Sequence, residues 1–260
     1  MAKELGVKVV PIYVRFGNQV YRDGVDIQSD DFYRMLATSP VHPATSQPNP
    51  EDFESVYKEY CEKSDGIISV HISSKISGTY NSALIAKKAL GSKCPIEVID
   101  SQFNSAGLAL IVRASARIAK TSKNMANAIA DIRHYISQVD MFGYFNTMKY
   151  LARSGRVSRV IVVAANVLNV KPLLTFRDGE IIRAGLVRSL SRGIERLIQF
   201  VERKKNIAEM IITHSAVPKQ AEQLRKTLNR FLPEEQITIM KMGAGLGVHG
   251  GPGVLLVALR

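Results

Sequence analysis

A hydroxyl-rich segment, Ser73–Thr79, follows a strand-like apolar stretch and precedes a predicted helix over Ser77–Leu90. The first backbone N–H groups of a helix have no partner inside the helix, and together with the helix dipole they attract an anion. Ser77 and Thr79 add hydroxyl donors, while Gly78 lets the backbone approach a ligand closely. The segment therefore predicts an anion-binding site, with the alternative that Ser77 or Thr79 only caps the helix.

A second group of hydroxyls lies in a proline-rich loop. Thr45 and Ser46 belong to the sequence Thr45-Ser46-Gln47-Pro48, which precedes a predicted helix from Glu51 to Lys63. We expect these hydroxyls to provide a second set of donors that face the same anion. The alternative is a rigid turn whose hydroxyls satisfy local backbone groups.

The third feature is a glycine-rich segment, Gly243–Gly253, which contains His249 followed by Gly250. Residues 245–250 match the GxGxxG pattern, but the ten residues that follow cannot form the βαβ unit of a dinucleotide-binding fold. We expect a loop that brings the backbone near a ligand and presents His249, because imidazole can donate to a carboxylate or exchange protons near neutral pH. The alternative is a flexible loop between strands with an incidental histidine.

Other motifs of catalytic and metal-binding proteins are missing from the sequence. There is no GxxxxGK[ST] phosphate loop, no GxSxG turn and no HExxH pair. The remaining histidines show no metal-ligand spacing: His42, His71, His134 and His214. We therefore expect neither a metal nor another cofactor.

The composition is typical of a soluble globular protein. The chain has 260 residues, of which 46% are hydrophobic and 22% are charged, enough for one large domain or two modest ones. No run approaches the roughly 18 apolar residues of a membrane span, and the first residues lack the apolar core of a signal peptide. Cys61 and Cys94 have neither CxxC nor zinc spacing, so we expect two free thiols and a cytoplasmic location.

Positive charge is concentrated in the second half of the chain. Residues 1–145 contain 16 basic and 15 acidic side chains, whereas residues 146–260 contain 19 and 8. Such a field favours an anionic partner, although a generic basic surface is the plain alternative. Nucleic acid is disfavoured because the chain has no Trp and no basic–aromatic alternation that would stack bases.

The order of the predicted elements indicates an α/β protein with two α/β domains, over residues 1–146 and 147–260. In the first half, strands alternate with long helices, which predicts a parallel sheet in a three-layer arrangement. Its expected strands are Val7–Val14, Gly66–Ile72, Ile96–Ile99 and Met141–Phe145, and its expected helices are Asp26–Leu36, Glu51–Lys63, Ser77–Leu90, Asn104–Lys120 and Met125–Val139.

The second half predicts a mixed sheet with helices. Asp178-Gly179 lies between two apolar stretches and is a strong hairpin signal. The expected helices are Met148–Ala152, Arg159–Val167, Ser191–Arg203 and Pro218–Phe231, and the expected strands are Leu173–Phe176, Glu180–Val187, Ala208–Thr213, Ile237–Met242 and Val254–Leu259.

Several segments together resemble one family, the DegV family of bacterial fatty-acid-binding proteins, which includes the FakB subunits of fatty acid kinase. They occur in family order over nearly the whole chain. The matching stretches are Val10-Pro11-Ile12-Tyr13-Val14, Tyr21-Arg22-Asp23-Gly24-Val25-Asp26-Ile27, Thr45-Ser46-Gln47-Pro48, Ser73–Ala83, Val98-Ile99-Asp100-Ser101, Tyr150–Val157, Lys171-Pro172-Leu173-Leu174, Val187-Arg188 and His249-Gly250-Gly251-Pro252-Gly253.

The resemblance implies that one long-chain fatty acid is bound in a buried tunnel between the two domains. Its carboxyl group would be bound by Thr45, Ser77 and His249, and Arg188 would help kinase docking or phosphoryl transfer. The loops that would support the head group contribute Ser46, Gly78, Thr79 and Gly250.

By the same likeness, the protein is not itself an enzyme but a carrier that presents the carboxyl group to a separate ATP-dependent kinase for acyl-phosphate formation. We expect a monomer that makes transient contact with anionic membranes. The family's first strand and its polar turn would precede Met1. The competing hypothesis is a stand-alone acyl or phosphoryl hydrolase or transferase that uses Ser77 and His249.

Overall fold

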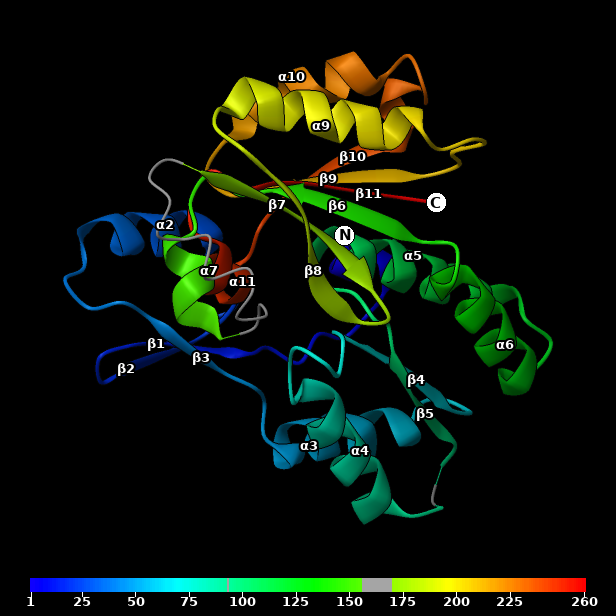
Figure 1. Cartoon of the computed structure of the whole chain (residues 1–260). Coiled ribbons are helices and arrows are strands. Elements are labelled where there is room, and N and C mark those ends of the chain that lie inside the picture. Colours follow the sequence, from blue (N-terminus) through cyan, green and yellow to red (C-terminus); the bar gives the residue numbers. More distant parts are fainter. Residues whose placement is uncertain (93, 156–169) are drawn as a thin grey trace.

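The computed structural model describes residues 1–92, 94–155 and 170–260 (Figure 1). Its strands form three sheets. A six-stranded sheet has the order β10-β9-β11-β6-β7-β8, a three-stranded antiparallel sheet has the order β2-β1-β3, and β4 pairs with β5 in parallel. The strands are β1 (Tyr13–Phe16), β2 (Gln19–Arg22), β3 (Ala44–Ser46), β4 (Ile67–His71), β5 (Ile96–Asp100), β6 (Asp140–Tyr144), β7 (Lys171–Arg177), β8 (Glu180–Val187), β9 (Met210–His214), β10 (Ile237–Lys241) and β11 (Leu255–Leu259).

The helices cover these sheets. They are α1 (Ala2–Leu5), α2 (Ser29–Thr38), α3 (Pro50–Cys61), α4 (Thr79–Leu90), α5 (Ser105–Thr121), α6 (Met125–Ile136), α7 (Lys149–Ser154), α9 (Leu190–Glu202), α10 (Pro218–Leu228) and α11 (Ala244–Gly250), with a short 3₁₀ helix at Glu234–Gln236. Among the described residues, no helix combines the length and hydropathy needed to cross a membrane.

The six-stranded sheet lies between two helical layers. Helices α9 and α10 cover one face and α5 covers the other (Figure 1). Every residue of β9 and β11 is buried, as expected for strands that are covered on both faces. One hydrophobic cluster fills the α9–α10 side and another fills the α5–α6 side.

The α/β fold expected from the sequence is confirmed, but the strands are distributed differently between the sheets. Only β4 and β5 form a parallel pair in the first half, because β6 pairs with β11 and β7 instead. Those partners come from distant parts of the chain, and the spacing of apolar residues does not encode which strands pair. The domain boundary at residue 146 stays a prediction.

One local expectation also differs from the structure, and another is not tested by it. The predicted strand Val7–Val14 is wrong over most of its length, since β1 begins at Tyr13 and Val9 is 58% exposed. A strand needs a pairing partner, and β2 and β3 pair only with Tyr13–Phe16. The predicted helix Arg159–Val167 lies outside the described residues.

The hairpin at Asp178-Gly179 is confirmed. β7 and β8 pair antiparallel on either side of it, and both turn residues have positive φ, 51° and 83°. The tip lies against the β4–α4 loop, where the buried Ser73 hydroxyl donates a 2.7 Å hydrogen bond to the Gly179 carbonyl. The hairpin therefore connects the six-stranded sheet to the loop after β4.

The expectation of two free thiols is wrong, because Cys61 and Cys94 form a disulfide. Cys61 ends α3 and Cys94 follows α4, and these two helices pack against each other (Figure 1). Their Cα atoms are 5.7 Å apart, within the usual range for a disulfide. Since helix packing brings the two cysteines together, their spacing in the sequence has no recognisable motif. Cysteine usage consequently no longer supports the expected cytoplasmic location.

His71, at the end of β4, is a buried polar residue of the core. Its Nε2 atom lies 2.8 Å from Ser69 Oγ, which in turn accepts a 2.8 Å hydrogen bond from the Tyr57 hydroxyl. Burial lowers the pKa of His71 to about 4, and the Asp100 carboxylate acts in the opposite direction. The imidazole is therefore neutral in the folded protein at pH 7.

We expect the free energy of unfolding to decrease as the pH falls from about 6.5 to about 4. In that window the unfolded chain binds a proton at His71 that the folded chain excludes, which contributes a slope approaching about 1.4 kcal/mol per pH unit. Urea unfolding of the wild type and of His71→Gln across this range measures the slope, which should be shallower in the variant. His134→Gln, on the exposed face of α6, is the control for replacing a histidine. Equal slopes for wild type and His71→Gln would contradict the prediction.

Candidate functional site

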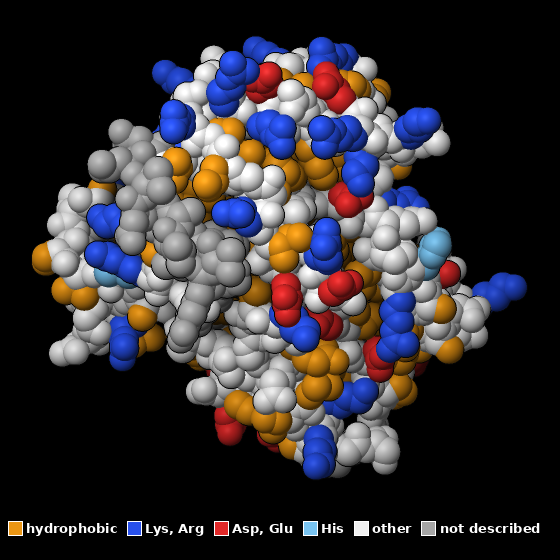
Figure 2. All heavy atoms as spheres, in the orientation of Figure 1, with side chains coloured by type: hydrophobic (Ala, Val, Ile, Leu, Met, Phe, Trp, Pro, Cys, Tyr) orange, Lys and Arg blue, Asp and Glu red, His pale blue; other side chains and the backbone are white. Residues whose placement is uncertain are grey.

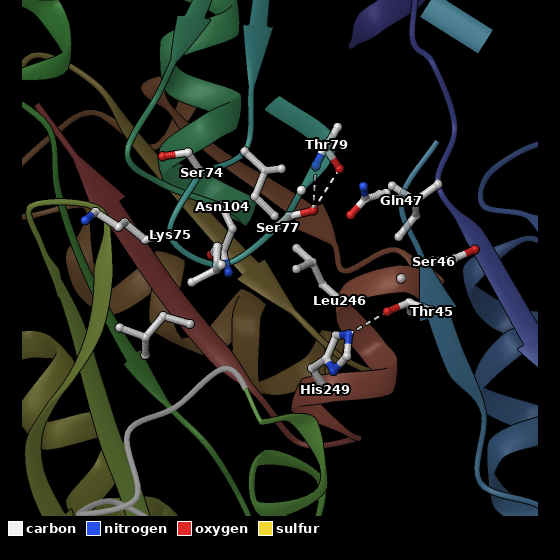
Figure 3. Close-up of a pocket in the computed structure, with 16 residues that line it drawn as sticks. Thr45, Ser46, Gln47, Ser74, Lys75, Ser77, Thr79, Asn104, Leu246 and His249 are labelled. Carbon is white, nitrogen blue, oxygen red and sulfur yellow. Dashed lines mark hydrogen bonds between the residues drawn. The ribbon is translucent and has the colours of Figure 1, made fainter. Parts of the chain in front are cut away.

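A cavity of about 330 Å³ lies between the β3 segment, the β4–α4 loop and α11 (Figure 3). These three elements are far apart in the sequence. Thr45, Ser46, Ser77, Gly78, Thr79 and His249 all line the cavity, so the structure brings together the three segments that the sequence analysis selected. Their role as ligand-binding residues stays a prediction.

Thr45 and His249 meet across one side of the cavity. Thr45 lies in β3 opposite Val14 of β1, and its Oγ1 atom is 2.8 Å from His249 Nε2. The register of β3 on β1 therefore determines where this hydroxyl stands. A bound anion would meet a hydroxyl and an imidazole side by side.

The loop before α4 provides the opposite side. Ser77 Oγ is 2.8 Å from Thr79 Oγ1 and accepts a 3.3 Å hydrogen bond from the Thr79 backbone N–H. The capping alternative is wrong for both residues, because neither is the N-cap and, among the described residues, no side chain caps the helix. Helix α4 begins at Thr79, with Gly78 as its N-cap. Gly78 leaves room for the end of the Gln47 side chain, because a Cβ at this position would lie 2.1 Å from its oxygen. Gln47 lines the cavity as well, although the sequence analysis did not select it as a site residue.

The glycine-rich segment forms a helix, and the expectation of a loop is wrong. Residues 244–250 make up α11, which packs closely on β1 and α2. A Cβ at Gly245 would lie 1.9 Å from Ile12 Cδ1, and one at Gly247 would lie 2.5 Å from the Phe32 ring. The glycines therefore allow a short helix to approach its neighbours closely, and this helix carries His249.

A smaller apolar cavity of about 50 Å³ adjoins the first. Gly250, the last residue of α11, lines this second cavity. Residues that line both cavities are Asn104, Ile181, Leu246 and His249. The second cavity's other lining residues are mostly apolar, among them Met141, Phe145, Leu174, Phe176 and Leu256. The hydroxyl-lined cavity thus adjoins an apolar one beside His249.

Arg188 lies outside the lining of both cavities. It is exposed and follows the last residue of β8, whereas Ile181 near the start of β8 lines the cavities. At about 3.3 Å per residue, the two positions are on the order of 20 Å apart along the strand. Arg188 therefore belongs to a different surface from the cavity.

The geometry offers little support for a serine nucleophile with a histidine base. Nucleophilic catalysis requires the base within hydrogen-bonding distance of the hydroxyl that it activates. In this structure Ser77 Oγ contacts Thr79, and His249 Nε2 contacts Thr45. Within the described ranges, no group of three or more His, Cys, Asp or Glu side chains could hold a metal ion.

Asp23, which follows β2, holds the start of α11. Its two carboxylate oxygens accept hydrogen bonds of 3.0 and 2.9 Å from the backbone N–H groups of Ala244 and Gly245. A carboxylate at this end of a helix satisfies free N–H groups and complements the helix dipole. Because the same helix ends with His249 and Gly250, Asp23 fixes the position from which His249 reaches Thr45.

We expect Asp23→Ala to lower the free energy of unfolding by about 1–2 kcal/mol, because it leaves two N–H groups of α11 without an acceptor. It should also shift the NMR signals of the His249 ring, since α11 loses its anchor. Asp23→Asn keeps one acceptor oxygen and should show a smaller effect. The neighbouring Asp26→Asn is the control, because it removes the charge of an exposed carboxylate that binds the side chain and N–H of Arg22 and accepts no hydrogen bond from α11. Unchanged His249 signals in Asp23→Ala would contradict this positioning role.

The chain is similar to known proteins over its whole length. Residues 1–260 match the family model described as "DegV: Uncharacterised protein, DegV family". A DegV domain-containing protein of Caldanaerobacter subterraneus is 31% identical over 258 residues, which cover 97% of this chain and 90% of that protein.

Two solved structures share the fold at comparable coverage. A fatty-acid-binding DegV family protein of Thermus thermophilus superimposes with a TM-score of 0.89 at 29% identity, covering 100% of this chain and 94% of that one. A stearic-acid-binding protein of Eubacterium ventriosum superimposes with a TM-score of 0.87 at 25% identity, covering 100% and 93%. The family match, the sequence relatives and the shared fold agree, and the chain belongs to the DegV family.

Proposed function

We propose that this protein binds one long-chain fatty acid, with the carboxyl group between Thr45, Ser77 and His249 and the acyl chain directed into the adjoining apolar cavity, which would have to widen to hold the whole chain. The observation that carries the proposal is the hydroxyl-lined cavity that adjoins an apolar one beside His249. The family members of Thermus thermophilus and Eubacterium ventriosum, which bind a fatty acid and stearic acid, support it.

The two parts of such a ligand contribute differently to binding. An acyl chain of about fifteen methylenes, at ~0.8 kcal/mol each, supplies about 12 kcal/mol of gross transfer free energy. Each neutral hydrogen bond to the head group adds only about 1 kcal/mol. Chain burial therefore dominates the affinity, while the polar residues decide which end of the ligand lies beside His249.

Mass spectrometry of the purified protein, first native and then denaturing, tests the binding. We expect one fatty acid of 14 to 18 carbons per protein molecule. This range includes an acid with about fifteen methylenes, whose burial supplies about 12 kcal/mol of gross transfer free energy. A folded protein that neither retains nor takes up such an acid would contradict the proposal.

We further propose that the bound carboxyl group is presented to a separate ATP-dependent kinase, which forms the acyl phosphate. The protein would then act as a cytoplasmic, monomeric carrier without a cofactor. Transient contact with an anionic membrane would allow it to exchange its ligand. The exposed basic residues of α9 and α10 support an acidic partner surface; they are Arg192, Arg196, Arg203, Lys219 and Lys226. Figure 2 shows Lys and Arg side chains spread over this end of the molecule.

Replacing Ser77 or Thr45 by Ala should impair presentation more than retention. Fatty-acid affinity should fall by no more than about fivefold, the equivalent of one hydrogen bond. Acyl-phosphate formation with added kinase should fall by tenfold or more, because a displaced reacting group costs up to about 10²-fold in rate. The two quantities are measured by ligand titration and by ³²P transfer, with Thr227→Ala on α10 as control. Equal losses in both would show that these hydroxyls serve retention alone.

We propose that Arg188 acts in kinase docking. Because Arg188 lies far from the cavity, the structure gives no support for a direct role in phosphoryl transfer. Arg188→Glu should slow acyl-phosphate formation at low kinase concentration by about tenfold, with a weaker effect at high salt, while fatty-acid binding stays unchanged. Lys120→Glu on α5 makes the same charge change on the other half of the chain and is the matched control. A similar loss in both variants would refute a specific role for Arg188.

A further inference from the structure

Asn104 occupies the place where the polar and apolar cavities meet. It is one of the residues that line both, and its neighbour Ser105 lines the apolar cavity. The other residues shared by the two cavities are Ile181, Leu246 and His249. Asn104 therefore supplies the amide group at a junction that is otherwise lined by two aliphatic side chains and the imidazole.

The turn before Asn104 is held by hydrogen bonds on both sides. The Phe103 N–H donates to Ser101 Oγ at 3.2 Å, and the Ser101 hydroxyl donates to the Phe103 carbonyl at 3.1 Å. The same carbonyl accepts a 2.9 Å hydrogen bond from the Ser73 N–H, and the Gln102 N–H donates to Asp100 Oδ1 at 2.8 Å. These bonds tie the turn to the end of β5 and to the loop after β4, so the fold sets the backbone position of Asn104.

The Asn104 side chain does not cap the helix that follows it. Asn104 is the N-cap of α5, a position where asparagine ordinarily accepts a hydrogen bond from the helix, yet it makes no capping bond. Within the described part of the chain, neither the Asn104 amide nor the Ser105 hydroxyl has a hydrogen-bond partner. Ser105 has φ of 45°, a backbone conformation that serine rarely adopts. Figure 3 shows the Asn104 side chain in the cavity, close to the Ser77 loop.

The Asn104 amide lies where the acyl chain of the ligand would pass, and this step rests on the proposed function. An acyl chain that leaves a carboxyl group near Thr45, Ser77 and His249 and enters the apolar cavity passes Asn104. Unsubstituted methylenes would remove water from the amide and offer no partner, which is unfavourable for a polar group. A hydroxyl on the first carbons of the chain would both donate to and accept from the amide, with Ser105 as a second partner.

We propose that this protein selects long-chain fatty acids that carry a hydroxyl group close to the carboxyl end, and that Asn104 recognises this hydroxyl. Asn104 is then a specificity-determining residue, whereas Thr45, Ser77 and His249 hold the carboxyl group.

Calorimetric titration with hexadecanoic, 2-hydroxyhexadecanoic and 3-hydroxyhexadecanoic acid tests the proposal on delipidated protein. We expect at least one hydroxy acid to bind the wild type about three- to tenfold more tightly than hexadecanoic acid, the range of one hydrogen bond. In Asn104→Leu, which keeps the number and branching of the side-chain heavy atoms but lacks the amide, this preference should disappear while hexadecanoic acid still binds. Asn104→Ser retains a donor and an acceptor and should keep part of the preference.

Asn81→Leu, at an exposed position of α4 outside both cavities, is the matched control and should leave the preference unchanged. Equal or weaker binding of both hydroxy acids by the wild type would overturn the proposal. So would an equal loss of affinity for all three acids in Asn104→Leu, which would place the amide on the carboxyl group. If none of the acids binds, the proposed function itself fails, and this result is distinct from a loss of preference alone.

Discussion

The contact between Thr45 Oγ1 and His249 Nε2, 2.8 Å long, joins residues that are 204 positions apart. It exists only if β3 pairs with β1 in the observed register and α11 lies against the same small sheet. Asp23 sets the start of α11, and the glycines of this helix allow it to approach Ile12 and Phe32. The packing of one seven-residue helix thus determines the geometry of the whole cavity.

Local chemistry explains which parts of this arrangement could be predicted from the sequence. Asp178-Gly179 is recognisable because its positive φ angles favour these residue types. Ser77 and Thr79 are recognisable because a hydroxyl-rich segment between a strand and a helix indicates a helix start. For the same reason Asn104, which directly follows a predicted strand and its turn, could have been selected as a cavity residue. His249 was found by residue type and neighbouring glycines, although its secondary structure was predicted wrongly.

The remaining features depend on contacts between distant segments. The partners of β6 are β11 and β7, and nothing in the sequence of β6 distinguishes them from a parallel neighbour. Cys61 and Cys94 are joined because α3 and α4 pack together, not because of their spacing. In the glycine-rich segment, the choice between loop and helix depends on whether Ile12 and Phe32 approach it, since glycine itself disfavours a helix by about 1 kcal/mol per residue. Tertiary packing therefore overrides the local preference.

The cavity is closed by contacts between elements that belong to different sheets. On one side the imidazole of α11 meets Thr45 of the three-stranded sheet, and on the other the Ser73 hydroxyl binds the Gly179 carbonyl at the tip of the β7–β8 hairpin. A ligand that binds between these elements only in the folded chain would add its binding free energy to the stability of the fold. Burial of an apolar chain would supply most of that free energy, while a few polar groups determine the ligand's orientation. Because affinity and orientation depend on different residues, each can change without loss of the other.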